Sequence, residues 1–188
     1  MSEAPPQAST VHAFERLIEP LMAPAYRTAL QFARNAADAE ELVQDATVQA
    51  YRAFGSFREG TYFRAWFFKI LTNLAIHRYR QKQRRPDSVS LDSAADTGLW
   101  EMARDGGAGP ESQVFTKFDR ERVSDALDAL PDEFQTVCTL YLMEEFSYEE
   151  ISEILEVPIG TVRSRLHRGR KLLQISLIGL AQEQGLLQ

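Results

Sequence analysis

The chain has few of the residues that build covalent or metal-bound frameworks. It contains one cysteine and three histidines among 188 residues. A single cysteine excludes an internal disulfide, and with so few histidines no Cys/His zinc site can be assembled. No apolar run approaches the roughly 20 residues of a membrane helix. The first ten residues (MSEAPPQAST) have neither the basic start nor the apolar segment of a secretory signal. We therefore expect a cytoplasmic protein with no metal, no cofactor and no membrane insertion.

Signals of β-strands, internal repeats and common enzyme sites are also missing. No phosphate-binding glycine loop or HExxH motif is present, and Gly106, Gly107 and Gly109 fall in a polar stretch instead. Apolar residues recur at helical spacing among Ala, Leu, Arg, Gln and Glu. The sequence predicts an all-α protein that is not an enzyme, made of two small helical domains joined by a flexible acidic linker.

Breaks in the helical pattern set the expected domain boundaries. Pro86 ends a nearly continuous helical stretch, and the segment after it is polar, acidic and rich in glycine, which is typical of a linker. Within the first domain, Asp38 and Glu41 resemble a capping box that would begin a helix. In chain order the prediction is a disordered N-terminus (1–10), a first domain (11–85), a linker (86–112), a second domain (113–180) with helices near 113–129, 132–144, 148–155 and 159–178, and a tail (181–188).

Charge is distributed very unevenly along the chain. The net charge is −6, which by itself disfavours nucleic acid as a partner. However, residues 61–85 contain seven Lys or Arg and no acid, residues 123–157 contain ten acids and no base, and residues 158–182 contain five bases and no acid. Two acid-free basic blocks in an acidic chain indicate a protein that binds a polyanion.

The second basic block contains the sharpest motif, SYEEISEILEVPIGTVRSRLHRGRKLL from Ser147 to Leu173. Ser147 and Glu150 form a capping box, a tight turn follows, and a longer basic helix begins near residue 159. This arrangement predicts a helix-turn-helix, whose second helix reads the major groove of DNA. Apolar residues of that helix would pack inward, and Arg170 and Lys171 would reach phosphates. Its candidate DNA-reading residues, which lie off the apolar stripe, are Thr161, Arg163, Ser164, His167 and Arg168.

The first basic block interleaves aromatic and cationic side chains, as proteins that bind single strands do. Packing of these aromatics in a core is the alternative, and it remains open for each of them. Asn73 stands apart because a polar amide in an apolar run needs a partner, either as a helix cap or as a base reader. The candidates here are Tyr62, Phe63, Trp66, Phe67 and Phe68 with Arg64, Lys69, Arg78 and Arg80.

An acidic helix face precedes that block. It includes Glu40, Glu41, Gln44 and Asp45. Acids near a helix N-terminus stabilise the helix through its dipole, or they could dock a basic groove of a protein partner. Both interpretations stay open on sequence alone. Cys138 lies in an apolar helical context, which favours a place in the core.

Together these segments resemble bacterial RNA polymerase sigma factors of the extracytoplasmic-function (ECF) type. DAEELVQDATVQAYRAF is similar to the family's core-binding helix, and FRAWFFKILTNLAIHRYRQKQRRP to its promoter-melting and −10-reading segment. LPDEFQTVCTLYLMEEFSYEEISEILEVPIGTVRSRLHRGRKLL is similar to its −35-reading domain. The resemblance implies a stress-response transcription factor that binds the largest and second-largest subunits of core polymerase. It also implies two further partners. One is promoter DNA, double-stranded at −35 and single-stranded at −10, and the other is an anti-sigma factor.

The resemblance also implies roles for individual residues. Asn73, in a loop joining two helices, would form a pocket for a flipped −10 base, and many relatives have Asp at the position of His77. Core polymerase would dock on Asp38, Glu40, Glu41, Leu42, Gln44 and Asp45. The −10 DNA would contact Tyr62, Phe63, Trp66, Lys69, Asn73, Leu74, His77, Arg78, Arg80 and Lys82. The −35 DNA would contact Thr161, Arg163, Ser164, His167, Arg168 and Lys171.

Two other functions compete with this interpretation. A stand-alone helix-turn-helix regulator would leave the aromatic-cation segment and the acidic helix without a role. A metal-dependent nuclease would need converging carboxylates, which the sequence does not place.

Overall fold

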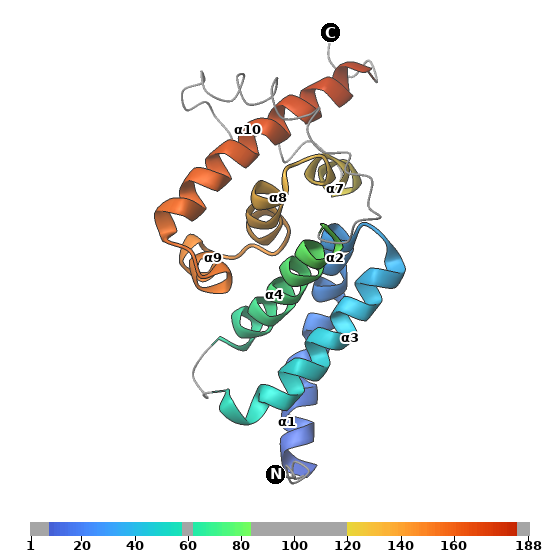
Figure 1. Cartoon of the computed structure of the whole chain (residues 1–188), viewed down its shortest axis with the longest axis vertical. Helices are drawn as coiled ribbons and strands as arrows, with labels where there is room; N and C mark the ends of the chain where they lie inside the picture. Colours follow the sequence, from blue (N-terminus) through green and yellow to red (C-terminus); the bar gives the residue numbers. More distant parts are fainter. Residues whose placement is uncertain (1–7, 58–61, 84–119, 184–188) are drawn as a thin grey trace. The chain divides into compact units, whose positions relative to one another are not determined.

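The computed structural model describes residues 8–57, 62–83 and 120–183, and all regular secondary structure within these ranges is helical (Figure 1). The all-α prediction is therefore confirmed for these parts of the chain. The helices group into two compact units, and the boundary between them falls near the C-terminal end of α4 (Phe63–Gln83). The expected linker, 86–112, lies outside the described residues.

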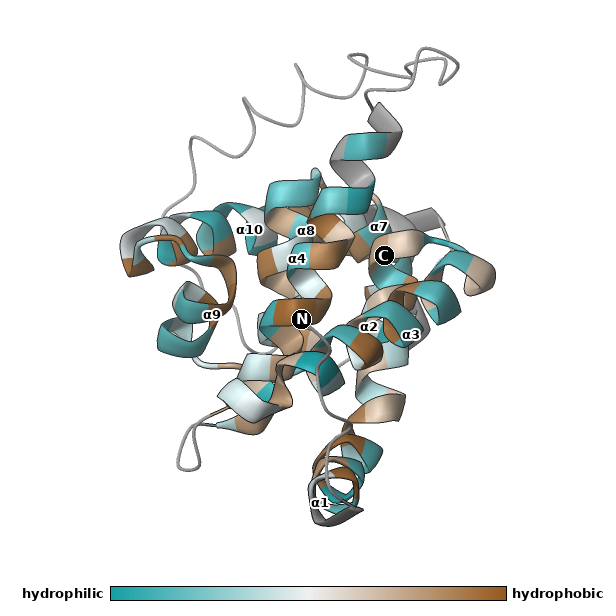
Figure 2. Cartoon of the chain, turned by 60° about the horizontal axis from the view of Figure 1, so that its bottom comes forward, coloured by the Kyte–Doolittle hydropathy of each residue, from teal (hydrophilic) through white to brown (hydrophobic). Residues whose placement is uncertain are grey.

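In its described part, the first unit consists of four α-helices and two short 3-10 turns. Hydrophilic and hydrophobic residues alternate around their turns, as expected for helices with one buried side (Figure 2). The first helix begins at Ala8, so part of the segment expected to be disordered is helical. In order, the elements are α1 (Ala8–Ile18), η1 (Glu19–Leu21), α2 (Met22–Ala33), α3 (Ala36–Ala53), η2 (Phe54–Ser56) and α4.

A left-handed residue and a side-chain cap form the turn between α2 and α3. Arg34 has a φ of 60°, and its amide donates to the carbonyl of Leu30 at 2.8 Å. Asn35 caps α3 because its Oδ1 accepts from the amide of Asp38 at 2.8 Å. The predicted capping box at Asp38 is wrong: α3 begins at Ala36, so Asp38 already lies in its first turn, where its carboxylate accepts from Asn35 Nδ2 at 2.8 Å.

Aromatic rings form the core between α1, η2 and the start of α4. Phe14 meets Phe54 edge to face with ring centroids 5.3 Å apart, and Phe57 meets Phe63 at 5.2 Å. The indole of Trp66 lies 5.1 Å from Phe57. Such edge-to-face and tilted pairs stabilise a core beyond the burial of their area. They therefore fix the first turn of α4 against the rest of the unit.

Helix α4 runs without a break from Phe63 to Gln83. The prediction of a loop at Asn73 between two helices is wrong, since Asn73 lies in the middle of this helix. The physical reason is the composition: the segment has no glycine or proline and is rich in Leu, Ala, Arg, Lys and Gln, all good helix formers. A single Asn costs a helix too little to end it.

The second unit contains the predicted helix-turn-helix. The capping box is confirmed, because Ser147 Oγ accepts from the amide of Glu150 at 3.2 Å and the Glu150 carboxylate accepts from the amide of Ser147 at 2.8 Å. The last helix continues to Glu183, past its expected end at residue 178. In order, the elements are α7 (Arg120–Asp128), α8 (Asp132–Cys138), a π-helical turn η3 (Thr139–Met143), α9 (Tyr148–Leu155) and α10 (Ile159–Glu183).

Helix α10 lies close against α8. Val162, Leu166 and Leu173 are buried along one side of α10, which confirms the predicted apolar stripe. At Gly169 the two helices approach so closely that an added Cβ would stand 2.4 Å from Cys138 Sγ. The absence of a side chain at Gly169 therefore sets the packing distance between α8 and α10.

Candidate nucleic-acid interface

The turn between α9 and α10 sets the direction of the second helix. Glu156 adopts a left-handed conformation with φ of 54°, and α10 begins directly after Pro158. Because Val162 and Leu166 are buried, the residues between and beside them face outward. The exposed side chains in the first half of α10 are Arg163, Ser164, His167 and Arg168, as predicted from the stripe.

Two other residues of the predicted set are less accessible. Thr161 is half-buried, and its carbonyl accepts from Ser164 Oγ at 3.0 Å. The Nζ atom of Lys171 is buried and has no hydrogen-bond partner in the structure described. The structure therefore contradicts the prediction that Lys171 contacts a phosphate, because the Nζ atom that would make this contact is buried. In the chain, Lys171 directly precedes the buried Leu172 and Leu173.

Arg170 also lies on the protein side of α10. Its guanidinium stands 4.5 Å from the ring centroid of Tyr141, a cation–π contact. This contact links α10 to the turn that follows α8. Arg170 therefore supports the position of α10 in addition to any contact with phosphates.

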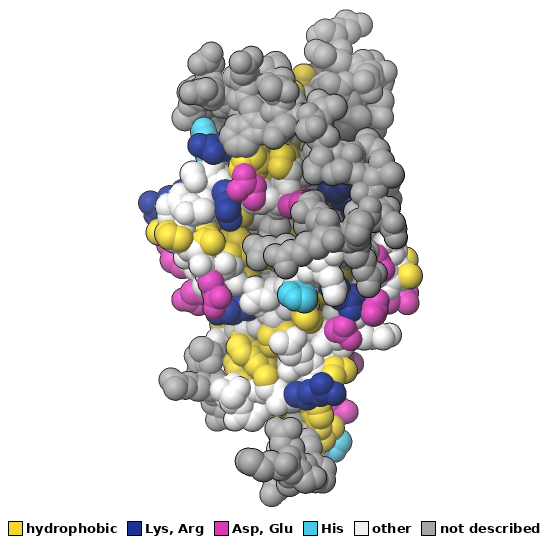
Figure 3. All heavy atoms as spheres, in the orientation of Figure 1, with side chains coloured by type: hydrophobic (Ala, Val, Ile, Leu, Met, Phe, Trp, Pro, Cys, Tyr) yellow, Lys and Arg dark blue, Asp and Glu magenta, His cyan; other side chains and the backbone are white. Residues whose placement is uncertain are grey.

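The outer side of α3 is acidic. Figure 3 shows acidic side chains gathered over this helix. Leu42 is an exception in the predicted docking set: it is 2% exposed and belongs to the core, so its prediction as a docking residue is wrong. It faces inward because it shares the buried side of α3 with Val43 and Ala46. The polar members of the set, Asp38, Glu40, Glu41, Gln44 and Asp45, are half-buried or exposed.

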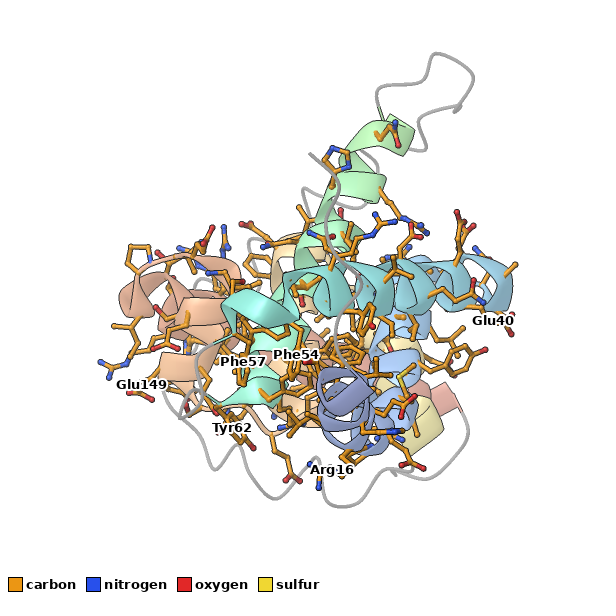
Figure 4. The ribbon with its side chains drawn as sticks, turned by 90° about the horizontal axis from the view of Figure 1, so that it is seen from below. Arg16, Glu40, Phe54, Phe57, Tyr62 and Glu149 are labelled. Carbon is orange, nitrogen blue, oxygen red and sulfur yellow. The ribbon has the colours of Figure 1, made fainter. Side chains whose placement is uncertain are left out.

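The aromatic residues at the start of α4 divide into two groups. Tyr62 is 58% exposed, and Figure 4 shows it at the edge of the first unit, while Phe54 and Phe57 are half-buried and lie nearer its middle. Phe63 is 7% exposed and packs against Phe14, Phe54 and Phe57. The prediction that Phe63 contacts DNA is therefore wrong, because a ring enclosed by other rings cannot stack on a base.

A pocket opens between α3 and α4. It is partly open to solvent, and its volume is about 340 Å³. Trp66, with one side against Phe57, forms part of its wall. Four residues predicted for single-strand DNA meet here, although the helix is continuous rather than looped. The lining residues are Gln49, Trp66, Lys69, Ile70, Asn73 and Leu74.

The cations beyond the pocket are placed differently. The guanidinium of Arg78 forms an ion pair with the carboxylate of Asp45. It forms a second ion pair with Glu41, in which Nη2 of Arg78 lies 3.4 Å from Oε1 of Glu41. Thus a residue predicted to hold phosphates is bound to two residues predicted to dock a protein. His77 is exposed. Arg80 and Lys82 lie in α4, but their side chains are outside the described part of the structure.

Sequence reasoning missed Gln49 and Ile70 in the pocket. Ile70 is an apolar residue at helical spacing, a pattern that by itself indicates a core position. Gln49 had one available signal: it follows Asp45 by four residues and so shares a side of α3 with Glu41 and Asp45. The sequence does not show that this side faces α4, because that depends on how the two helices pack.

Cys138 is a core residue, as predicted. It is fully buried, and burial raises the pKa of its thiol from 9.0 to about 12, partly opposed by the charge of Arg170. The thiolate is the reactive form of cysteine, so the folded protein holds it inert. Because the folded-state pKa is raised, the stabilising contribution of the neutral thiol is present below pH 9.0 and is lost between pH 9.0 and about 12.

We therefore expect Cys138 to resist alkylation in the native protein. At pH 8 a thiol with this pKa holds roughly a thousandfold less thiolate than one at its ordinary value. Iodoacetamide labelling followed by mass spectrometry, with and without urea, measures this directly. Modification of the native chain as fast as of the unfolded chain would contradict the buried, protonated state.

Residues 8–57, 62–83 and 120–183 contain no group of three or more His, Cys, Asp or Glu side chains that could hold a metal ion. Within the same ranges, no helix combines the length and the apolar character that crossing a membrane requires.

Both units match known sequence families. Residues 17–85 match the family described as Sigma-70 region 2, and residues 120–173 match Sigma-70, region 4. The chain is 33% identical over 168 residues to the ECF RNA polymerase sigma factor SigW of Bacillus subtilis, covering 88% of this chain and 89% of that protein. It is 34% identical over 141 residues to the ECF RNA polymerase sigma-E factor of Escherichia coli, covering 72% of each.

Solved structures show the same fold. The sigma factor RpoE in complex with the anti-sigma factor NepR, from Bartonella quintana, is similar with a TM-score of 0.69 and 26% identity, covering 88% of this chain and 96% of that one. CnrH in complex with the cytosolic domain of CnrY has a TM-score of 0.62 at 24% identity and covers 89% of each chain.

Proposed function

The chain belongs to the ECF sigma factors of the sigma-70 family, and from that premise we propose how its two units recognise a promoter. As a sigma factor it is a transcription factor for initiation rather than an enzyme. The first unit captures an unpaired base of the −10 element, and the second reads the −35 element in the major groove. Two modules on one chain that is itself bound to polymerase gain affinity through effective concentration, even if each binds DNA weakly.

The exposed polar side of α10 is the observation that most directly supports this proposal. Arg163 and Arg168 can each bond a guanine through two hydrogen bonds, while Ser164 and His167 add shorter-range donors and acceptors. All four lie in the first half of the helix, the part that a helix-turn-helix places against base edges. The buried stripe and the capped α9 fix the backbone of this surface, so the entropy lost on binding comes mainly from its side chains.

The pocket between α3 and α4 supports the proposal for the first unit. Trp66 offers an aromatic surface for stacking, Asn73 an amide for the base edge, and Lys69 a positive charge for the backbone. Flipping a base costs a few kcal/mol, which a pocket present before DNA binds helps to offset. Exposed Tyr62 and His77 extend the same surface along the helix.

Core polymerase is proposed to dock on the acidic side of α3. Glu40 and Gln44 are exposed there, Asp38 is half-buried beside its hydrogen-bond partner Asn35, and Figure 4 shows Glu40 pointing away from the unit near the start of the helix. Arg78 is proposed to exchange its partners Asp45 and Glu41 for DNA phosphates in the initiation complex. Such exchange is inexpensive, because exposed ion pairs contribute only about 0–1 kcal/mol each. An anti-sigma factor is proposed as the inhibitory partner, supported by the similar RpoE–NepR complex.

Run-off transcription on pooled genomic promoter fragments tests the proposal. Purified bacterial core polymerase, with and without the protein, is expected to give new discrete start sites that share two spaced upstream elements. A loss of these transcripts with the Asn73→Ala variant, while the folded protein still binds core polymerase, would assign the −10 role. No new transcript from cognate core, together with tight promoter binding by the protein alone, would instead indicate a stand-alone regulator.

A further inference from the structure

Gln49 occupies a position between the two functional surfaces of the first unit. Glu41, Asp45 and Gln49 follow one another at intervals of four residues on α3 and therefore share a side of the helix. The first two contact Arg78 of α4. Gln49, one turn further along, lines the pocket together with residues of α4. This side of α3 thus faces α4, and Gln49 faces the pocket.

The pocket presents a specific set of chemical groups. Gln49 from α3 and Asn73 from α4 each supply a carboxamide, which has both donors and an acceptor. Lys69 supplies donors only, and Trp66, Ile70 and Leu74 supply an apolar surface. Flat apolar walls with two amides from different helices suit a nucleobase, whose faces are apolar and whose edge alternates donors and acceptors.

Resting on the proposed function of this pocket, we propose that Gln49 is a specificity-determining residue for the captured −10 base. Its carboxamide reads the base edge from the α3 side, while Asn73 reads it from the α4 side. Two readers on separate helices restrict the orientation of the base as well as its identity. Among the described residues that line the pocket, Gln49 alone comes from α3, so it approaches the base from a direction that the described α4 side chains do not provide.

The test uses holoenzyme and a promoter library with randomised −10 positions, each linked to a barcode in the transcribed region, and it sequences the barcodes of the run-off transcripts. Gln49→Ala is expected to flatten the base preference at one position by about fivefold or more, since one good amide–base pair discriminates by at least that factor. Gln49→Glu retains the shape but only accepts hydrogen bonds. It is expected to shift the preference at that position away from thymine and toward the bases with an exocyclic amino group, cytosine, adenine and guanine.

Val48→Ala is the matched control. Val48 is the neighbouring residue, 47% exposed, and it does not line the pocket. We expect this variant to keep the base preference of the parent. Circular dichroism confirms that each variant is folded.

The possible outcomes distinguish a failure of the role of Gln49 from a failure of the proposed base capture in the pocket. If Asn73→Ala flattens the preference and both Gln49 variants leave it unchanged, the role of Gln49 is refuted and base capture in the pocket stands. If neither position affects the preference, base capture in this pocket is itself refuted. A change with Gln49→Ala that Val48→Ala reproduces would also refute the assignment, because the effect would not come from the pocket.

Discussion

Replacing Arg163 with alanine is expected to reduce transcription from cognate promoters by about 5- to 150-fold, the range of discrimination that one bidentate arginine–guanine pair provides. Arg163 is exposed in the first turns of α10, where a helix-turn-helix meets base edges. Its removal leaves the core intact, so stability is expected to change by less than about 0.5 kcal/mol. Run-off transcription on promoters with single substitutions in the −35 element measures the effect.

The pattern across promoters distinguishes a base contact from a phosphate contact. A base reader relaxes the preference at one base pair, whereas a phosphate contact weakens all promoters equally and lowers the salt dependence of binding. Arg165→Ala is the matched control, because it removes the same charge from the same helix. Arg165 pairs with Glu133 at 3.3 Å and lies only 30% exposed. Equal losses for both variants would contradict base reading by Arg163.

Local sequence signals predicted the second unit well, because its determinants are close together in the chain. Ser147 and Glu150 are three residues apart, and their capping box needs only the first turn of α9. The stripe of Val162, Leu166 and Leu173 follows the period of a single helix. Once one side of α10 is buried, the exposed residues follow from helical geometry alone.

Predictions taken residue by residue from family resemblance were less accurate in the first unit. Leu42 and Phe63 were assigned to binding surfaces, yet both are buried, because each lies on the side of its helix that packs inward. The expected loop at Asn73 is absent, since helix-forming neighbours on both sides maintain α4. An apolar residue inside a motif gives no indication by itself of whether it meets a partner or the core.

The pocket depends on information that sequence periodicity does not contain. Gln49 and Asn73 are 24 positions apart in the chain and lie on different helices. Their proximity follows from the packing of α3 against α4. The pairing of Arg78 with Asp45 and Glu41 has the same origin. Contacts between α3 and α4 therefore bring together residues that were predicted from the sequence to dock polymerase and residues that were predicted to contact −10 DNA.

Gly169→Ala is expected to destabilise the second unit by about 1–2 kcal/mol. The new Cβ would stand 2.4 Å from Cys138 Sγ and 3.3 Å from the Cβ of Phe134. Overpacking of this kind costs about 1–3 kcal/mol, offset by up to about 1 kcal/mol from the better helix propensity of alanine. For a unit of this size the melting temperature should fall by roughly 5–15 °C, measured by circular dichroism or calorimetry on the full chain.

Two further variants test the cause. Gly160→Ala is the matched control on the same helix, because a Cβ there meets nothing within 4 Å, and its stability should be unchanged or up to about 1 kcal/mol higher. Cys138→Ala removes the sulfur that the new methyl group strikes. Added to Gly169→Ala, it should cost less than the sum of the two single changes, and a double-mutant cycle measures that coupling. Strict additivity, or a Gly169→Ala variant as stable as the parent, would mean that α10 shifts on α8 instead of clashing. The exposed arginines would then be held less rigidly than the packing at Gly169 indicates.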